Sequence, residues 1–145
     1  MKIAILSCFY PYRGGISQFN ACLYSELSRN HIVKAFNFKR QYPEFLFPGK
    51  TQYVTQDDEA VPVESISLLD TANPFTYHST FKAIRDWNPD ILIVRYWMSY
   101  FGPSLGYITR RMKKHCKVIS ILDNVIPHEP RFFDTPLTRY FLSGS

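Results

Sequence analysis

The chain has few cysteines and no long hydrophobic run. Only three cysteines occur in 145 residues, Cys8, Cys22 and Cys116, and their spacing fits neither a metal site nor a disulfide framework. We therefore expect reduced thiols in a cytoplasmic protein. No apolar run reaches the roughly 20 residues that a membrane-spanning helix needs. The opening MKIAILSC is also too short an apolar run for a signal peptide.

Three motifs of well-known enzyme classes are missing from the sequence. There is no G-x-G-x-x-G fingerprint, no Gly-Lys-Ser/Thr phosphate-binding loop and no G-x-S-x-G nucleophile elbow. Their absence argues against a dinucleotide-dependent Rossmann enzyme such as an epimerase, against a P-loop NTPase and against a serine hydrolase. No nucleic-acid-binding motif occurs either, so no nucleic-acid partner is expected.

Acidic residues are missing from one long segment. Residues 91–122 contain no Asp or Glu but six basic residues, and the whole chain carries a net charge of +5. Such a segment indicates either a negatively charged neighbour or an ordinary solvated helix face. Four of its residues would contribute to binding an anionic membrane surface, at about 1 kcal/mol per basic residue: Arg110, Arg111, Lys113 and Lys114. A peripheral position at the inner face of the membrane is therefore one expectation, and it is compatible with packing of the apolar helix face on the protein.

Short apolar runs alternate with helical patterns along the chain. Strands are expected at 2–7, 31–38, 63–69, 90–97 and 117–122, and helices at 16–30, 73–87, 103–114 and from 134 almost to the end. The segment 40–62 is irregular, with a short strand expected near Tyr53. This alternation predicts one α/β domain over residues 1–145, a Rossmann-like parallel sheet with helices on both faces. Because the last helix ends the chain where a strand would follow, we expect a piece of a larger protein.

Ligands of an open parallel sheet bind beyond the carboxyl ends of its strands, and three loops lie there. The first, YPYRGG, contains Arg13, Gly14 and Gly15. The two glycines let a ligand approach the backbone, and the amides at the start of the following helix suit a phosphate or a sugar hydroxyl. A simple tight turn explains a Gly-Gly pair equally well.

The second loop is aromatic. Tyr96, Trp97, Tyr100 and Phe101 follow the strongest predicted strand. Aromatic rings stack on the apolar faces of sugars, but they also fill protein cores. We therefore interpret this loop as a candidate wall for a sugar ligand, with core packing as the alternative.

The third loop, DNVIPHEPR, gathers polar side chains. Asp123, Asn124, His128 and Glu129 could hydrogen-bond a polyhydroxylated ligand from several sides. A metal site is not expected, because no second His or Cys lies near the His-Glu pair. Alternatively, the Asp and Asn bond the loop's own backbone and His128 packs beneath it.

The segments FYPYRGGISQF, NPFTY, PDILIVRYWMSYFGP and DNVIPHEPR occur in this order and at these spacings. Together they resemble the N-terminal domain of family 4 glycosyltransferases, retaining enzymes of the GT-B fold. The resemblance spans nearly the whole chain. It implies transfer of a sugar, without a metal or other cofactor, from a nucleotide-sugar to a glycan or glycolipid, as in polysaccharide biosynthesis.

The resemblance also implies residue roles. Gly14 and Gly15, with Arg13, would lie near the donor diphosphate, and His128 with Glu129 would be the catalytic pair beside the transferred sugar. The acceptor substrate would meet five residues: Tyr96, Trp97, Tyr100, Asp123 and Asn124. Asp123 departs from the family pattern, in which relatives often have His before Asn-Val.

In such enzymes a second domain holds the nucleotide, and this chain does not contain it. We therefore expect residues 1–145 to be inactive alone and the uncovered cleft wall and strand edge to favour a homodimer. A non-catalytic binding or regulatory domain with the same fold is the alternative function.

Overall fold

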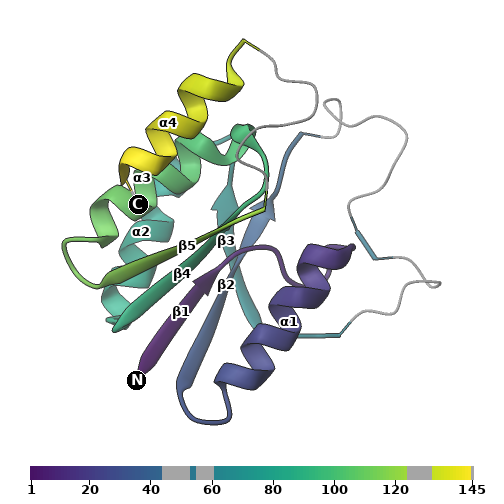
Figure 1. Ribbon diagram of the computed structural model, residues 1–145. Coiled ribbons are helices and arrows are strands. Elements are labelled where there is room, and N and C mark those ends of the chain that lie inside the picture. The colour runs from purple at the N-terminus through teal and green to yellow at the C-terminus, as the bar shows by residue number, and fades with distance from the viewer. Residues whose placement is uncertain (44–52, 55–60, 124–131, 145) are drawn as a thin grey trace.

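The structure, a computed structural model, describes residues 1–43, 53–54, 61–123 and 132–144, and it is a layered α/β fold (Figure 1). Five parallel strands lie in the order β3-β2-β1-β4-β5. The strands are β1 (Lys2–Leu6), β2 (Ile32–Arg40), β3 (Ser65–Asp70), β4 (Ile91–Tyr96) and β5 (Lys117–Leu122). The helices are α1 (Gly15–Leu27), α2 (Phe75–Trp87), α3 (Gly102–Met112) and α4 (Asp134–Gly144), with a short 3-10 turn, η2 (Ser99–Phe101), before α3. The predicted fold class is therefore confirmed.

The strands form where the sequence has short apolar runs, because both faces of a parallel sheet are buried. In the central strands, Leu6 lies beside Phe36 of β2 and beside Val94 of β4. Tyr96 pairs with Leu122 at the end of β4 and β5. All five strands therefore finish at one edge of the sheet, which we call the carboxyl edge.

Helices cover both faces of the sheet, as predicted, but unequally. α1 lies on one face, over a small cluster that includes Ile5, Phe9 and Ile93. α2, α3 and α4 lie on the other face, over the larger cluster (Figure 1). The aromatic members of that larger cluster with less than 2% exposure are Phe36, Phe38, Tyr96, Phe101 and Phe141. Among the described residues, no helix is both long enough and apolar enough to cross a membrane.

α3 and α4 approach each other closely because glycines lie between them. A Cβ added at Gly102 would lie 2.7 Å from the backbone oxygen of Leu137. A Cβ added at Gly106 would lie 2.6 Å from a ring carbon of Tyr140. Neither position has room for a side chain, so the α3–α4 contact depends on these two glycines.

We predict that Gly102→Ala destabilises the protein by about 1–3 kcal/mol, because a backbone oxygen cannot move aside as a flexible side chain can. The matched control is Gly15→Ala, at the first residue of α1, where an added Cβ meets no atom within 4 Å. The control should be neutral or slightly stabilising. Urea unfolding followed by circular dichroism measures both. Equal stability of the two variants would contradict the close approach of α3 and α4.

Candidate functional site

The carboxyl edge contains a point where the order of the strands reverses. From β1 the chain runs outward through β2 and β3, and then returns to place β4 on the other side of β1. Ligands of open α/β sheets bind at such a switch point. We call the residues there the switch-point site: the loop 7–15 after β1, Phe19 on α1, Arg95 on β4 and Asp123 after β5.

The two glycines of the loop leave open space around the N-terminus of α1. Gly14 has φ 111° and ψ 174°, a conformation that side chains disfavour, and it precedes a helix with no side-chain cap and no acid in its first turn. A Cβ at Gly14 or Gly15 would meet no atom within 4 Å. Since a helix N-terminus carries partial positive charge, this opening suits a negatively charged or hydroxyl-bearing ligand. Arg13 lies beside it and is exposed.

Two buried asparagines fix the loop in place. Asn37 on β2 accepts a hydrogen bond from the Phe9 amide at 3.1 Å, and its own amide group donates to the Tyr10 carbonyl at 3.0 Å. Asn20 on α1 donates to the Ser7 hydroxyl at 2.7 Å and to the Cys8 carbonyl at 2.9 Å. Sequence reasoning missed both residues, although a polar residue inside an apolar strand, as at Asn37, is a signal that could have been used.

Arg95 and Asp123 form a two-pronged ion pair across β4 and β5. The Nε of Arg95 donates to Oδ2 of Asp123 and its Nη2 donates to Oδ1, both at 2.6 Å. The Arg95 side chain is 10% exposed and the Asp123 side chain 28%. The backbone amide of Asp123 also donates to the Tyr96 carbonyl at 3.0 Å. Asp123, expected to meet the acceptor substrate, is thus held on Arg95, which sequence reasoning placed only among the basic residues of segment 91–122.

The guanidinium of Arg95 lies on an aromatic ring. Its Cζ is 4.2 Å from the centre of the Phe19 ring, and Phe19 is 48% exposed. Such cation–π contacts contribute about 0.5–2 kcal/mol. Arg95 therefore links β4 to α1 and to the residue that follows β5.

The aromatic loop divides between core and surface. Tyr96 is fully buried, stacks on Phe141 with ring centres 4.4 Å apart, and bonds the Thr138 hydroxyl at 2.7 Å. Its ring therefore faces α4, not the switch-point site. Trp97 and Tyr100 are partly buried and pack on Phe101 at the carboxyl edge. The Tyr100 hydroxyl accepts a hydrogen bond from Thr71 at 3.3 Å.

The structure brings together only part of the predicted site. Gly14, Gly15 and Asp123 lie at the carboxyl ends of β1 and β5, as expected from their positions in the sequence. Asn124, His128 and Glu129 lie outside the described residues. Among the described residues, no group of three His, Cys, Asp or Glu side chains could hold a metal ion. The expectation that no metal takes part remains a prediction, because His128 and Glu129 are not included.

Cys8 is the buried thiol of the switch-point site. Burial raises its pKa to about 12 from an ordinary 9.0, outweighing the opposite influence of Arg95. The thiol is therefore protonated and unreactive near neutral pH. Because the pKa is higher in the folded state, this group contributes stability that is complete below about pH 9 and is lost as the pH rises toward 12.

We predict that a thiol-specific disulfide reagent at pH 8 modifies Cys22 first, because Cys22 is exposed, and leaves Cys8 intact until the protein unfolds. Cys116 is partly buried and burial also raises its pKa, so it should react slowly. Absorbance of the released thiol follows the reaction. Cys22→Ser should remove the fast phase, and loss of that phase in Cys8→Ser instead would contradict the assignment.

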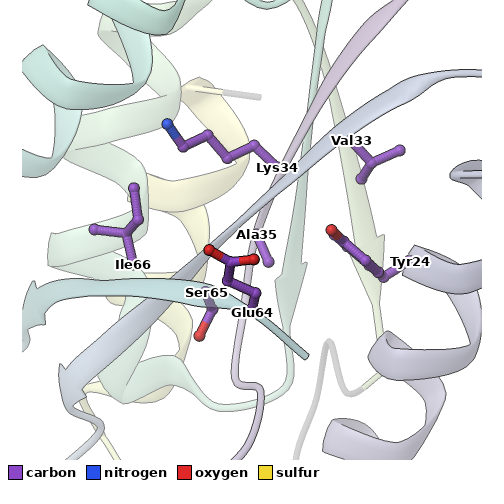
Figure 2. A pocket seen from close by; sticks show the side chains of 7 residues that line it. All are labelled: Tyr24, Val33, Lys34, Ala35, Glu64, Ser65 and Ile66. Atoms are coloured by element: carbon purple, nitrogen blue, oxygen red, sulfur yellow. The ribbon is translucent and has the colours of Figure 1, made fainter. Parts of the chain in front are cut away.

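A hollow of about 310 Å³ lies near the start of β3 (Figure 2). Its lining residues are Tyr24, Val33, Lys34, Ala35, Glu64, Ser65 and Ile66. The Lys34 ammonium lies 5.8 Å from the centres of the Phe36 and Trp87 rings.

No protein-family model matches the chain, and no curated protein matches its sequence. We therefore infer the function from the fold and from the arrangement of the switch-point site. The resemblance to family 4 glycosyltransferases stays a prediction.

Proposed function

We propose that the protein is the N-terminal, acceptor-side domain of a retaining GT-B glycosyltransferase that moves a sugar from a nucleotide-sugar to a glycan or glycolipid. The observation that carries the proposal is the switch-point site, where an uncapped helix start with two open glycines adjoins the anchored Arg95–Asp123 pair. The parallel sheet with helices on both faces is the architecture that such a domain requires.

The described residues fit part of the chemistry. Retaining transfer requires the departing diphosphate to be stabilised by preorganised donors. In this proposal the amides at Gly14 and Gly15, with Arg13, supply such donors at the start of α1. His128 and Glu129 are proposed beside the transferred sugar on the resemblance alone. A second domain would hold the nucleotide, so we expect no turnover from residues 1–145 alone.

The test is transfer of radiolabelled sugar from nucleotide-sugars to a lipid and glycan extract, by the protein made from its whole reading frame and by residues 1–145. We expect activity from the protein made from the whole reading frame and none from residues 1–145.

In the whole protein, Gly15→Leu, which fills the open space at the start of α1, should lower the transfer activity at least about tenfold, equivalent to about 1.4 kcal/mol.

The matched control is Ser25→Leu, at an exposed position nearer the other end of α1, which should retain activity. Activity of residues 1–145 alone would refute the need for a second domain. Binding of sugars without transfer by the whole reading frame would favour the alternative, a non-catalytic binding domain.

We also propose that the basic end of α3 faces an anionic membrane. Arg110 donates to the Tyr140 carbonyl and the Ser143 hydroxyl, and the Lys113 ammonium lies 3.4 Å from the Ser143 carbonyl, so both contact α4. Arg111, in the last turn of α3, and Lys114, two residues beyond its end, are both exposed. Flotation with vesicles containing anionic lipid should fall in Arg111→Glu/Lys114→Glu, and unchanged flotation would refute this surface.

A further inference from the structure

Arg95 carries a hydrogen-bond donor that the protein does not use. The residue is 9% exposed, and its Nε and Nη2 both donate to Asp123. Its Nη1 is buried and has no hydrogen-bond partner among the described residues. Leaving a buried donor unpaired costs about 1–3 kcal/mol, and more for a charged group. The unmet donor therefore requires an explanation.

The donor is held in a fixed position. The two bonds to Asp123 define the plane of the guanidinium, and its Cζ lies 4.2 Å from the centre of the Phe19 ring. The backbone bond from Asp123 to Tyr96 ties the pair to the sheet. A donor whose orientation is set before binding loses little conformational freedom when it meets a ligand.

The surroundings favour a negatively charged oxygen as the partner of Nη1. Residues 91–122 contain no acid, and α1 has none in its first turn. Both oxygens of Asp123 are already engaged by Arg95, so this carboxylate cannot also serve Nη1 in the same arrangement. Hydrogen bonds that involve an ionised group are about twice as strong as those between neutral groups, and a guanidinium matches the geometry of carboxylates and phosphates.

We propose that Nη1 of Arg95 binds an oxyanion carried by the acceptor substrate, either a phosphate or a carboxylate, at the switch-point site. This inference rests on the proposed function, because it gives the acceptor-side domain an acidic sugar as its ligand. Asp123 acts as the positioning residue that holds the guanidinium, and Phe19 is the surface on which the guanidinium rests. Arg95 is thereby the residue that distinguishes acidic from neutral acceptor substrates.

The experiment is isothermal titration calorimetry of the 145-residue protein with three probes: glucose 6-phosphate, glucuronate and glucose. One or both acidic probes should bind at least about tenfold more tightly than glucose, and the preferred probe identifies the oxyanion. Arg95→Gln should lose that preference by about 10- to 100-fold, the range expected for a hydrogen bond to a charged group. Arg95→Lys keeps the positive charge but not the planar set of guanidinium donors, so it should lose most of the preference for the acidic probe.

The matched control is Arg85→Gln, because Arg85 also lies on an aromatic ring, Phe81, and also donates twice to a carboxylate, Asp86, but its side chain is 39% exposed on α2. It should bind all probes as the unchanged protein does. Nitrogen-15 spectra of the arginine side chains in the unchanged protein give a second readout that does not depend on the stability of a variant. The Arg95 signals should shift on titration with the preferred acidic probe, and the Arg85 signals should not.

Three results would overturn the inference: no preference for an acidic probe, equal loss of binding in Arg95→Gln and Arg85→Gln, or unshifted Arg95 signals. These failures are separable from failure of the proposed function. Sugar transfer by the whole reading frame to a neutral acceptor refutes the oxyanion site but leaves the transferase. Binding that depends on Arg95, without any sugar transfer, supports the oxyanion site but refutes the transferase.

Discussion

Phe141→Ala is expected to lower the free energy of unfolding by about 3–5 kcal/mol, the range for truncating a fully buried aromatic ring. Phe141 is 0% exposed, and its ring stacks on Tyr96 with an angle of 7° between the ring planes. Removing it leaves a cavity between β4 and α4, because Tyr96 is held by its bond to Thr138 and cannot follow.

The measurement is chemical unfolding followed by far-ultraviolet circular dichroism and tryptophan fluorescence. The matched control is Phe132→Ala, because Phe132 is 94% exposed and its truncation should change stability by no more than about 0.5 kcal/mol. A cost for Phe141→Ala as small as that of the control would mean that α4 does not pack on the sheet.

Asp123→Ala is expected to cost about 2–4 kcal/mol. Breaking a buried ion pair from one side leaves an uncompensated charge, which costs about 3–5 kcal/mol when both groups are buried. The Asp123 side chain is 28% exposed, so water relieves part of this cost. The matched control is Asp86→Ala, because Asp86 pairs with Arg85 at 2.9 Å with both side chains exposed, and such pairs contribute about 0–1 kcal/mol.

The unfolding free energy at neutral pH again gives the result. If the cost comes from the unpaired guanidinium, the double variant Arg95→Met/Asp123→Leu should recover most of it, since an apolar pair of similar size needs no counter-charge. An Asp123→Ala variant no less stable than Asp86→Ala would show that the pair is not desolvated.

Much of the fold could be predicted because several strands, β1 and β4 above all, are short and mainly apolar runs. The predicted strand at 117–122 coincides with β5, and the first predicted strand exceeds β1 by one residue. Asn73, expected at the start of a helix, accepts a hydrogen bond from the Phe75 amide at 3.1 Å. The strand expected near Tyr53 is a single antiparallel bridge to Tyr12, with the two rings stacked 5.2 Å apart.

The switch-point site was less accessible to sequence reasoning because neighbouring strand residues face opposite sides of the sheet. Arg95 faces α1, and Tyr96 faces α4, yet the run DILIVRYW is apolar on both sides of the strand and gives no sign of which residue faces which helix. Sequence reasoning indicated the loop but included Tyr96 among the site residues and left out Arg95. A charged residue at the end of a two-sided apolar strand is the signal that could have identified Arg95.

The glycine contacts between α3 and α4 have a consequence for how this protein can vary. Tyr140 fills the space that a side chain at position 106 would need, and a Cβ at Gly144 would lie 3.2 Å from the Gly106 carbonyl. A larger residue at position 106 therefore becomes tolerable only when position 140 shrinks. We expect positions 106 and 140 to co-vary among homologues, so that a larger residue at one accompanies a smaller residue at the other.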